Sequence, residues 1–360
     1  MQSFSEIILT WYDTYGRDLP WRRTRDPYAI WLSEIILQQT RIAQGQAYWE
    51  RFLATGPDVQ ALAAASEDEV LRLWQGLGYY SRARNLHAAA KQIVAAGHFP
   101  DTLEGIRALK GVGDYTAAAI GSIAFGLPAA VVDGNVYRVL ARCYGLETPI
   151  GSTAAKKEFT ALAQSLLPPD RPGDFNQGMM DFGAMQCTPD APCCPICPLA
   201  DRCAALATGR VDRLPVREKG PAVQERRFDY VYVRFGGRTA IRRRGPGDIW
   251  QGLYEPLVRE ASARGGNTPI CPSQPKKTVT RGKKASICPR EPMLLRAGVK
   301  HQLTHRTLIV DFYLWEPAEE PVLPDGYVWI DEAELDRYAK PRLFELLLEI
   351  LPAGTSEVNP

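Results

Sequence analysis

The sequence lacks an apolar run long enough to cross a bilayer. Its longest apolar stretch, residues 117–132, is interrupted by Gly and Ser and falls short of the roughly 20 residues that a membrane helix needs. The N-terminus carries Glu6 and Asp13 and has no basic segment, so it does not resemble a secretory signal. We therefore expect a cytoplasmic protein without a membrane partner.

A strong excess of either charge is also lacking. The chain of 360 residues holds 43 Lys and Arg against 41 Asp and Glu, and this net charge of +2 says little about a polyanionic partner. With 45% hydrophobic and 23% charged residues, the composition is that of a core-forming protein with two or three globular units. Collagen-like, fibrous and wholly disordered proteins are excluded. Any binding of nucleic acid has to be argued from local motifs.

The first half of the chain has the periodicity of helices. Apolar residues recur at three- and four-residue spacing up to about residue 207, which predicts an all-α half of roughly ten short helices. Asp26, Ser66 with Glu69, and Ser152 are signals for helix starts.

The second half predicts an α+β unit. Residues 208–227 are rich in Pro, Gly and charge and predict a linker. Beyond them FDYVYVRF, TAIRRR, TLIVDFYLW and GYVWI alternate and predict strands, while residues 291–296 and 333–351 are expected to be helical. The polar residues 265–289 form either a plain flexible loop or one that touches DNA.

Four cysteines fall at a specific spacing within a proline-rich segment, Cys187-x6-Cys194-x2-Cys197-x5-Cys203. In a cytosolic chain this spacing favours a metal over a disulfide framework. Zinc sites favour paired Cys-x2-Cys knuckles, whereas one tight pair flanked by a distant thiolate on each side suits a larger cubane. We predict a [4Fe-4S] cluster, with zinc as the alternative.

The remaining cysteines are expected to stand apart from this cluster. Cys193 is interpreted as a non-ligand because Cys194 keeps the spacing, and Cys143, Cys271 and Cys288 are interpreted as isolated. Since a flavin or nicotinamide motif is absent from the sequence, the cluster is expected to clamp a loop and not to belong to a redox chain.

Two glycine-containing turns carry candidate chemistry. In LKGVGDYTA, Gly111 and Gly113 precede a helix, so backbone N–H groups and the helix dipole are available to a phosphate. In VVDGN, Asp133 lies on a sharp turn after an apolar segment. Alone, the first would be an ordinary turn between helices and the second an N-cap.

Glu34 is a candidate general acid. It lies among apolar residues on a predicted helix, WLSEIIL, where desolvation raises the pKa of a carboxyl group toward neutrality. If Asp133 is kept ionised on its polar turn, the two carboxyl groups form a pair with divided roles.

These motifs, in this order, resemble the helix-hairpin-helix DNA glycosylases of the endonuclease III superfamily. Within it, WLSEIILQQT and GYYSRARN are similar to the MutY-type adenine DNA glycosylases. The resemblance covers residues 1–205 densely and the rest loosely. It implies an all-α helix-hairpin-helix glycosylase core with an iron-sulfur cluster loop, followed by an α+β Nudix-like domain.

The resemblance also implies the reaction and its partner, double-stranded DNA with adenine opposite 8-oxoguanine or G. The adenine is flipped out, Glu34 protonates a ring nitrogen, and the N-glycosidic bond breaks through an oxocarbenium-like state. Asp133 stabilises or captures the sugar cation, and Asn135 orients Asp133 or the water. An enzyme of this kind is expected to be a monomer associated with the nucleoid.

Tyr115 separates two kinds of glycosylase. Endonuclease III relatives carry a Schiff-base lysine at the corresponding position, and tyrosine cannot replace its amine. The sequence therefore favours hydrolysis without strong lyase activity. An endonuclease III-like enzyme for other bases and a non-catalytic lesion-binding iron-sulfur protein are the alternatives.

By match to the family, further residues are expected to bind the substrate. The adenine-binding set is Arg17, Trp21, Leu37, Ile42, Gln177 and Met180. The DNA-binding set is Gln39, Thr40, Tyr79, Arg82, Arg84, Gly111 and Gly113.

The C-terminal unit is expected to read the base opposite adenine. It lacks the glutamate cluster of a hydrolytic Nudix helix, so pyrophosphatase activity is not expected. The family uses a Phe-Ser-His loop, and this chain has Leu303, Thr304 and His305 there. Since leucine replaces the aromatic wedge, lesion discrimination should be weaker or differently shaped.

The predicted domains follow from these features. Residues 1–207 form the glycosylase domain, with a six-helix core over about 22–128 and a cluster subdomain made of the N-terminal helix and about 129–207. Residues 208–227 are the linker, 228–352 the Nudix-like domain and 353–360 a tail.

Overall fold

The computed structural model describes residues 2–218, 223–260 and 291–352. The chain divides into two compact units, Met1–Ala65 with Arg82–Gly220, and Ser66–Ser81 with Pro221–Pro360. We call them the helical unit and the sheet unit. The segment 265–289 and the tail 353–360, for which we made predictions, lie outside the described residues.

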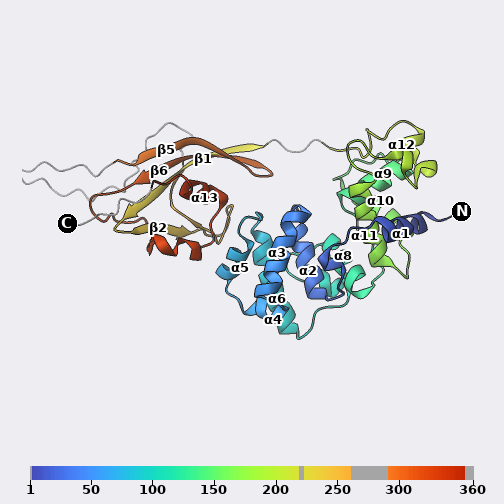
Figure 1. Ribbon diagram of the computed structural model, residues 1–360, viewed down its shortest axis with the longest axis horizontal. Coiled ribbons are helices and arrows are strands. Elements are labelled where there is room, and N and C mark those ends of the chain that lie inside the picture. Colours follow the sequence, from blue (N-terminus) through green and yellow to red (C-terminus); the bar gives the residue numbers. More distant parts are fainter. Residues whose placement is uncertain (1, 219–222, 261–290, 353–360) are drawn as a thin grey trace, which may run out of the picture. The chain divides into compact units, whose positions relative to one another are not determined.

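The predicted all-α first half is confirmed (Figure 1). Its elements are α1 (Phe4–Tyr15), η1 (Pro20–Arg22), α2 (Pro27–Leu37), α3 (Ile42–Thr55), α4 (Val59–Ala64), α5 (Glu67–Trp74), α6 (Ser81–Ala96), α7 (Leu103–Arg107), α8 (Asp114–Phe125), α9 (Gly134–Tyr144), α10 (Thr153–Leu166), α11 (Pro172–Met185), η2 (Cys194–Ile196), η3 (Ala200–Arg202) and α12 (Ala204–Ala207). None of the helices in the described ranges is long and apolar enough to span a membrane.

The predicted caps explain where several helices begin. The Asp26 carboxylate accepts from the N–H groups of Tyr28 and Ala29 at the start of α2. Ser66 and Glu69 form a capping box on α5, and Ser152 caps α10. Each cap satisfies a backbone donor that the first helical turn leaves without a partner.

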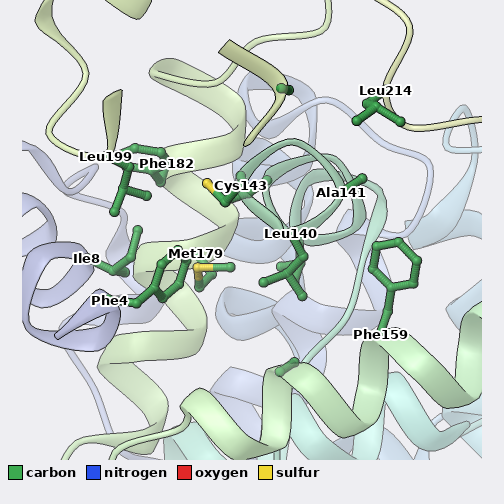
Figure 2. Close-up of a cluster of buried hydrophobic side chains, with 14 of the residues drawn as sticks. Phe4, Ile8, Leu140, Ala141, Cys143, Phe159, Met179, Phe182, Leu199 and Leu214 are labelled. Atoms are coloured by element: carbon green, nitrogen blue, oxygen red, sulfur yellow. The ribbon is translucent and has the colours of Figure 1, made fainter. Parts of the chain in front are cut away.

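A large apolar cluster joins the N-terminal helix to the second half of the helical unit (Figure 2). Phe4 and Ile8 of α1 pack with Leu140 of α9 and with Phe182 of α11. Helix α11 contacts α1 and α9 extensively, so it links the N-terminal helix to α9. A smaller cluster, built on Ile30 of α2 and the alanines of α8, holds the paired helices α2 and α8 together.

The sheet unit contains the predicted strands. They are β1 (Gln224–Phe235), β2 (Arg238–Arg243), β3 (Tyr254–Glu255), β4 (Leu257–Glu260), β5 (Met293–Gln302), β6 (Arg306–Trp315) and β7 (Tyr327–Asp331). The order is β3-β2-β1-β6-β5, with β4 paired to β1 and β7 to β2. Strands β1 and β6 are parallel and the other pairs antiparallel. Helix α13 (Arg342–Leu348) packs Leu343, Phe344 and Leu347 into the core of this unit.

Two helical predictions were wrong in detail. Residues 291–296 enter strand β5, because pairing with β6 overrides the helical preference of Met293 and its leucine neighbours. The helix expected over 333–351 splits into the 3-10 helix η4 (Glu332–Arg337) and α13. Pro341 stands between them, and proline breaks a helix because it lacks an N–H.

Candidate active site

A cavity of about 210 Å³ lies in the helical unit, where α2, α8, α9 and α11 meet. Glu34 of α2 and Asp133, the N-cap of α9, both line it. Tyr115 of α8 and Asn135 of α9 line it as well. All four predicted catalytic residues, which come from three separate helices, are thus brought to one cavity.

The environment of Glu34 favours its protonated form. Trp31, Ile35 and Ile36 of the same helix are buried, and Glu34 itself is half-buried in the cavity wall. Burial raises its pKa to about 7, against the opposing effects of the Tyr115 hydroxyl and the Arg22 charge. The Tyr115 hydroxyl donates to Glu34 Oε2 at 3.4 Å, which is a long hydrogen bond.

Asp133 is held by donors from its own helix. Its carboxylate accepts from the Val136 N–H and from Asn135 Nδ2, each at 2.8 Å. The turn is less solvated than its polar sequence implies, and this burial raises the pKa of Asp133. The donors from Val136 and Asn135 and the charge of Arg138 oppose that rise. Asp133 is therefore more favoured as an anion than its burial alone would allow.

The predicted adenine-binding residues surround the same cavity. Its wall includes all six of them, Arg17, Trp21, Leu37, Ile42, Gln177 and Met180. Trp21 and Gln177 are buried. Thr40, predicted to bind DNA, also lines the cavity.

Sequence reasoning missed Arg22 in this wall and Asp181 behind it. Arg22 lines the cavity, and the buried Asp181 accepts hydrogen bonds from both Arg22 and Arg17. Asp181 is 159 residues from Arg22 in the sequence, so no spacing rule pairs them. The only local signal was the position of Asp181 next to Met180 of the predicted site.

The hairpin before α8 has a positive φ at Gly111 but not at Gly113, where φ is −96°. Gly111 has φ +78°, and a Cβ there would lie 2.6 Å from the Asn85 Cβ. Gly113 is the N-cap of α8, with open space where a Cβ would stand. The open space at Gly113 leaves the N-terminus of α8 approachable by a ligand.

The other predicted DNA-binding residues differ in exposure. Gln39 is exposed and adopts φ +58°, whereas Arg84 is half-buried. Arg82 is buried, and its Nη1 donates to the carbonyl oxygens of Ile35 and Ile36 near the end of α2. Its predicted contact with DNA stays a prediction.

The four predicted cluster cysteines line a second cavity in the helical unit, together with Cys143. Cys143, expected to be isolated, is buried beside Cys203, whereas Cys193 is exposed and is not part of this lining. Arg142 Nη1 donates to Cys187 Sγ at 3.4 Å. In the described ranges no three His, Cys, Asp or Glu side chains stand close enough to hold a single metal ion.

The predicted lesion-reading residues lie in the turn between β5 and β6. Leu303 is half-buried against the core of the sheet unit, while Thr304 and His305 are exposed. The Thr304 hydroxyl is hydrogen-bonded to the hydroxyl of Tyr79, which belongs to the same unit and has φ +47°. Two residues predicted to meet the opposing base are therefore in contact.

Comparison with known families matches both units. Residues 32–169 match the HhH-GPD superfamily of base excision DNA repair proteins, and residues 229–349 match the NUDIX domain. The first match contains Glu34, Tyr115 and Asp133, and thus the helices that bring these groups to the cavity. Fold and site together define the class, a helix-hairpin-helix base excision repair protein with a Nudix-type domain.

Curated relatives narrow this class. The adenine DNA glycosylase of Buchnera aphidicola subsp. Baizongia pistaciae is 31% identical over 86% of this chain and 84% of its own length. That of Buchnera aphidicola subsp. Acyrthosiphon pisum is 34% identical over 70% and 73%. The human adenine DNA glycosylase is 47% identical over 56% of this chain, which spans only 39% of that relative's length. This chain belongs to the adenine DNA glycosylase family.

Solved structures agree on the fold. A thermostable thymine-DNA glycosylase superimposes with a TM-score of 0.52 at 32% identity and covers 57% of this chain and 95% of its own. A trapped covalent complex of endonuclease III with DNA gives a TM-score of 0.50 at 21% identity, over 58% and 99%. The second likeness supports the helical fold alone.

Proposed function

We propose that this protein removes adenine from double-stranded DNA, where adenine stands opposite 8-oxoguanine or G, by hydrolysing its N-glycosidic bond. The observation that carries the proposal is that Glu34 and Asp133 line one cavity in a member of the adenine DNA glycosylase family. Because both carboxyl groups line this cavity, they can flank one extruded nucleoside. The protein would act as a monomer.

The two carboxyl groups have the environments that the reaction requires. With a pKa of about 7, Glu34 holds a proton near neutral pH and donates it to a ring nitrogen of adenine. The electrons of the N-glycosidic bond then pass to the protonated base. Asp133, which accepts from Asn135 and Val136, stabilises the cationic sugar until water adds to it.

Tyr115 argues against the alternative of an endonuclease III-like lyase. Its hydroxyl lies by Glu34 Oε2 and by Met180 Sδ, so it packs against the acid and offers no amine. Formation of a Schiff base at the sugar requires such an amine. We therefore propose a monofunctional enzyme. The pair of carboxyl groups in one cavity also argues against a protein that only binds lesions, since binding needs neither.

The mixed wall of the cavity suits a purine. Trp21, Leu37, Ile42 and Met180 offer apolar surface for the faces of the base. Arg17 and Gln177 offer donors and an amide oxygen to its edge. Extrusion of the base into such a pocket is the general solution for enzymes that act on bases.

Further DNA contacts are proposed from the backbone and from the match to the family. Gly111 and Gly113 present backbone amides of the hairpin to a phosphate. Gln39 and Tyr79 insert into the DNA duplex near the opposing base. Thr40, Arg82 and Arg84 complete the set. In the sheet unit Leu303, Thr304 and His305 would read 8-oxoguanine, with Thr304 starting from its bond to Tyr79.

The cysteine cavity fits a [4Fe-4S] cluster. Four thiols converge on it, and a [4Fe-4S] cluster is held by four cysteine thiolates. We propose Cys187, Cys194, Cys197 and Cys203 as its ligands. When bound, the cluster would tie their segments into one rigid loop. Arg142 would orient Cys187, since it also donates to the carbonyl oxygens of Thr188 and Pro189.

Single-turnover base release tests the function. The wild type should release adenine from duplexes with A opposite 8-oxoguanine and, more slowly, from A opposite G, and a thymine glycol duplex serves as the comparison. Glu34→Gln should reduce release by about 10³-fold or more while DNA binding stays nearly intact. Substantial turnover by this variant would remove Glu34 from its role, and efficient borohydride trapping would contradict monofunctional hydrolysis.

A further inference from the structure

One buried carboxylate joins two arginines in the cavity wall. The Asp181 side chain, on α11, is 0% exposed. Its Oδ1 accepts from Arg17 Nε at 2.8 Å and from Arg22 Nη2 at 2.9 Å. Its Oδ2 accepts from Arg22 Nη1 at 2.6 Å and from the backbone N–H of Arg17 at 2.9 Å. Each oxygen of the carboxylate thus accepts two of these hydrogen bonds, and together they hold the two guanidinium groups in one arrangement.

Asp181 stands behind the wall and not in it. Arg17 and Arg22 line the cavity, with side chains 29% and 11% exposed, whereas Asp181 does not line it. Burial alone would raise the pKa of Asp181, but the hydrogen bonds from Arg22 and Arg17 lower it below its usual value. Asp181 is therefore an anion, and the three groups leave one net positive charge beside Glu34.

We infer that Asp181 is a positioning residue of the adenine site, which fixes Arg17 and Arg22 in the cavity wall and sets the net charge that Glu34 faces. This inference rests on the proposed function for its place in catalysis. The charge relation itself is a property of the free protein and is testable without substrate.

Glu34 faces charged or titratable groups from several elements. They are Arg17 and Arg22 from the segment that includes η1, Tyr115 from α8, Asp133 from α9 with Arg138 behind it, and Asp181 from α11 behind the arginines. Arg22 favours the Glu34 anion and Asp133 opposes it. Removal of the Asp181 charge would leave both arginines uncompensated. The Glu34 anion would then be stabilised, and its proton would be lost at lower pH.

The same arrangement assigns a donor to the base. Among the described residues, the hydrogen bonds of Arg17 to Asp181 use Nε, Nη2 and the backbone N–H, which leaves Nη1 for a ligand. A guanidinium nitrogen can only donate, so it selects an acceptor on the base edge. In adenine the ring nitrogen N7 is such an acceptor.

The primary test is the titration of the Glu34 carboxyl carbon by ¹³C NMR in the free, full-length protein. Asp181→Asn should move its midpoint down, by up to about one pH unit, since the two arginines would then carry one more uncompensated positive charge. Arg22→Met should move the midpoint up, because it removes a cation. The double variant should return it close to the wild-type value.

Activity provides the second readout. If adenine release needs protonated Glu34, the pH at which single-turnover release falls should move with the NMR midpoint in each variant. A loss of rate at every pH with an unchanged midpoint would mean a merely structural role for Asp181 and would overturn the inference. An inactive wild type would refute the proposed function and leave the NMR shifts as the test of the charge relation.

Two controls make the result specific. Asp174, on the same helix, pairs with Arg171 and Arg25 and does not line the cavity, so Asp174→Asn should leave the Glu34 midpoint unchanged. Asp181→Glu keeps the charge and should keep the midpoint even if the rate falls. If Asp181→Asn fails to fold, Arg22→Met and Asp181→Glu still decide the inference. A midpoint for Arg22→Met that stays or moves down would refute it.

Discussion

At the scale of single residues, Glu34 shows what a candidate acid requires of its surroundings. Folding moves its carboxyl group from water into the wall of the cavity, and burial is the largest influence on its pKa. The folded protein therefore keeps a proton that the unfolded chain has already lost. This difference links the chemistry of the site to the stability of the protein.

The free energy of unfolding should consequently fall as pH rises from the ordinary glutamate pKa of 4.5 to about 7. Between these values the folded state binds more protons, so a rise in pH favours unfolding by about 3 kcal/mol in total. Glu34→Gln removes the ionisation and should be more stable than the wild type at pH 8, but not at pH 4. Urea unfolding at both pH values measures this, with the exposed Glu104→Gln as control. Equal stability of Glu34→Gln and wild type at pH 8 would contradict it.

Neighbouring cysteines 193 and 194 provide a second prediction at this scale. Cys194 lines the cavity of the four proposed ligands, whereas Cys193 is exposed outside it. Cys194→Ser should therefore lose iron and the visible absorption band on anaerobic purification, and Cys193→Ser should keep both. The matched pair differs by one position in the chain. Equal loss in both variants would disprove the assignment, and stoichiometric zinc in a colourless wild type would disprove the cluster.

At the scale of elements, the position of Asp133 depends on how closely α9 and α11 approach. Gly183 of α11 lies against the backbone of Asn135, where an added Cβ would come within 2.9 Å of the carbonyl oxygen. Arg138 strengthens this contact, since its Nη2 donates to the Gly183 carbonyl oxygen at 2.6 Å and to Asn135 Oδ1 at 2.9 Å. The lack of a side chain at Gly183 thus lets α11 pack directly on the start of α9, where Asp133 is the N-cap.

Gly183→Ala should force these helices apart. Overpacking a rigid backbone contact costs about 1–3 kcal/mol, and displacement of Asp133 should reduce base release by about tenfold or more with less effect on DNA affinity. Thermal unfolding and single-turnover release measure the two effects. Gly134→Ala, on α9 with open space at its Cβ, is the stability control. Wild-type release by Gly183→Ala would show that the helix contact does not position Asp133.

At the scale of the whole molecule, the sheet unit includes a segment from the first half of the sequence. Residues 66–81 are joined to the C-terminal strands by side chains. Arg243 donates to Glu67 and Asp68 at 2.9 and 3.0 Å, the Tyr254 hydroxyl donates to Asp68, and the Lys340 N–H donates to Gln75. The segment also carries Tyr79, so these contacts hold a proposed DNA-reading residue beside Thr304.

The two ion pairs of Arg243 are half-exposed, so their contribution should be modest and sensitive to salt. Arg243→Ala should lower the free energy of unfolding of the sheet unit by about 0.5–1 kcal/mol at low ionic strength, and by less in 1 M salt. It should also weaken discrimination between 8-oxoguanine and G, because Tyr79 loses part of its support. Arg337→Ala, which removes a pair within η4, is the control. Unchanged discrimination would separate this contact from lesion reading.

Local chemistry in the sequence determined much of the fold. Caps such as Asp26 and Ser66, the spacing of apolar residues and the alternation in β1 and β6 are properties of neighbours in the chain, and they predicted most elements correctly. Local signals failed at residues 291–296, where pairing with a distant strand decided the outcome. The candidate acid, the Asp133 turn and the spacing of four cysteines were equally readable, because each motif occupies a few consecutive positions.

Only the tertiary structure decided how these motifs meet. That Glu34 and Asp133 line one cavity, that Cys143 lies with the cluster cysteines and that Asp181 joins two arginines are contacts between residues far apart in the chain. Such contacts depend on how helices pack, and packing is set by the whole set of buried side chains. The pKa of Glu34 follows the same rule, since burial and the Arg22 charge act across space and not along the sequence.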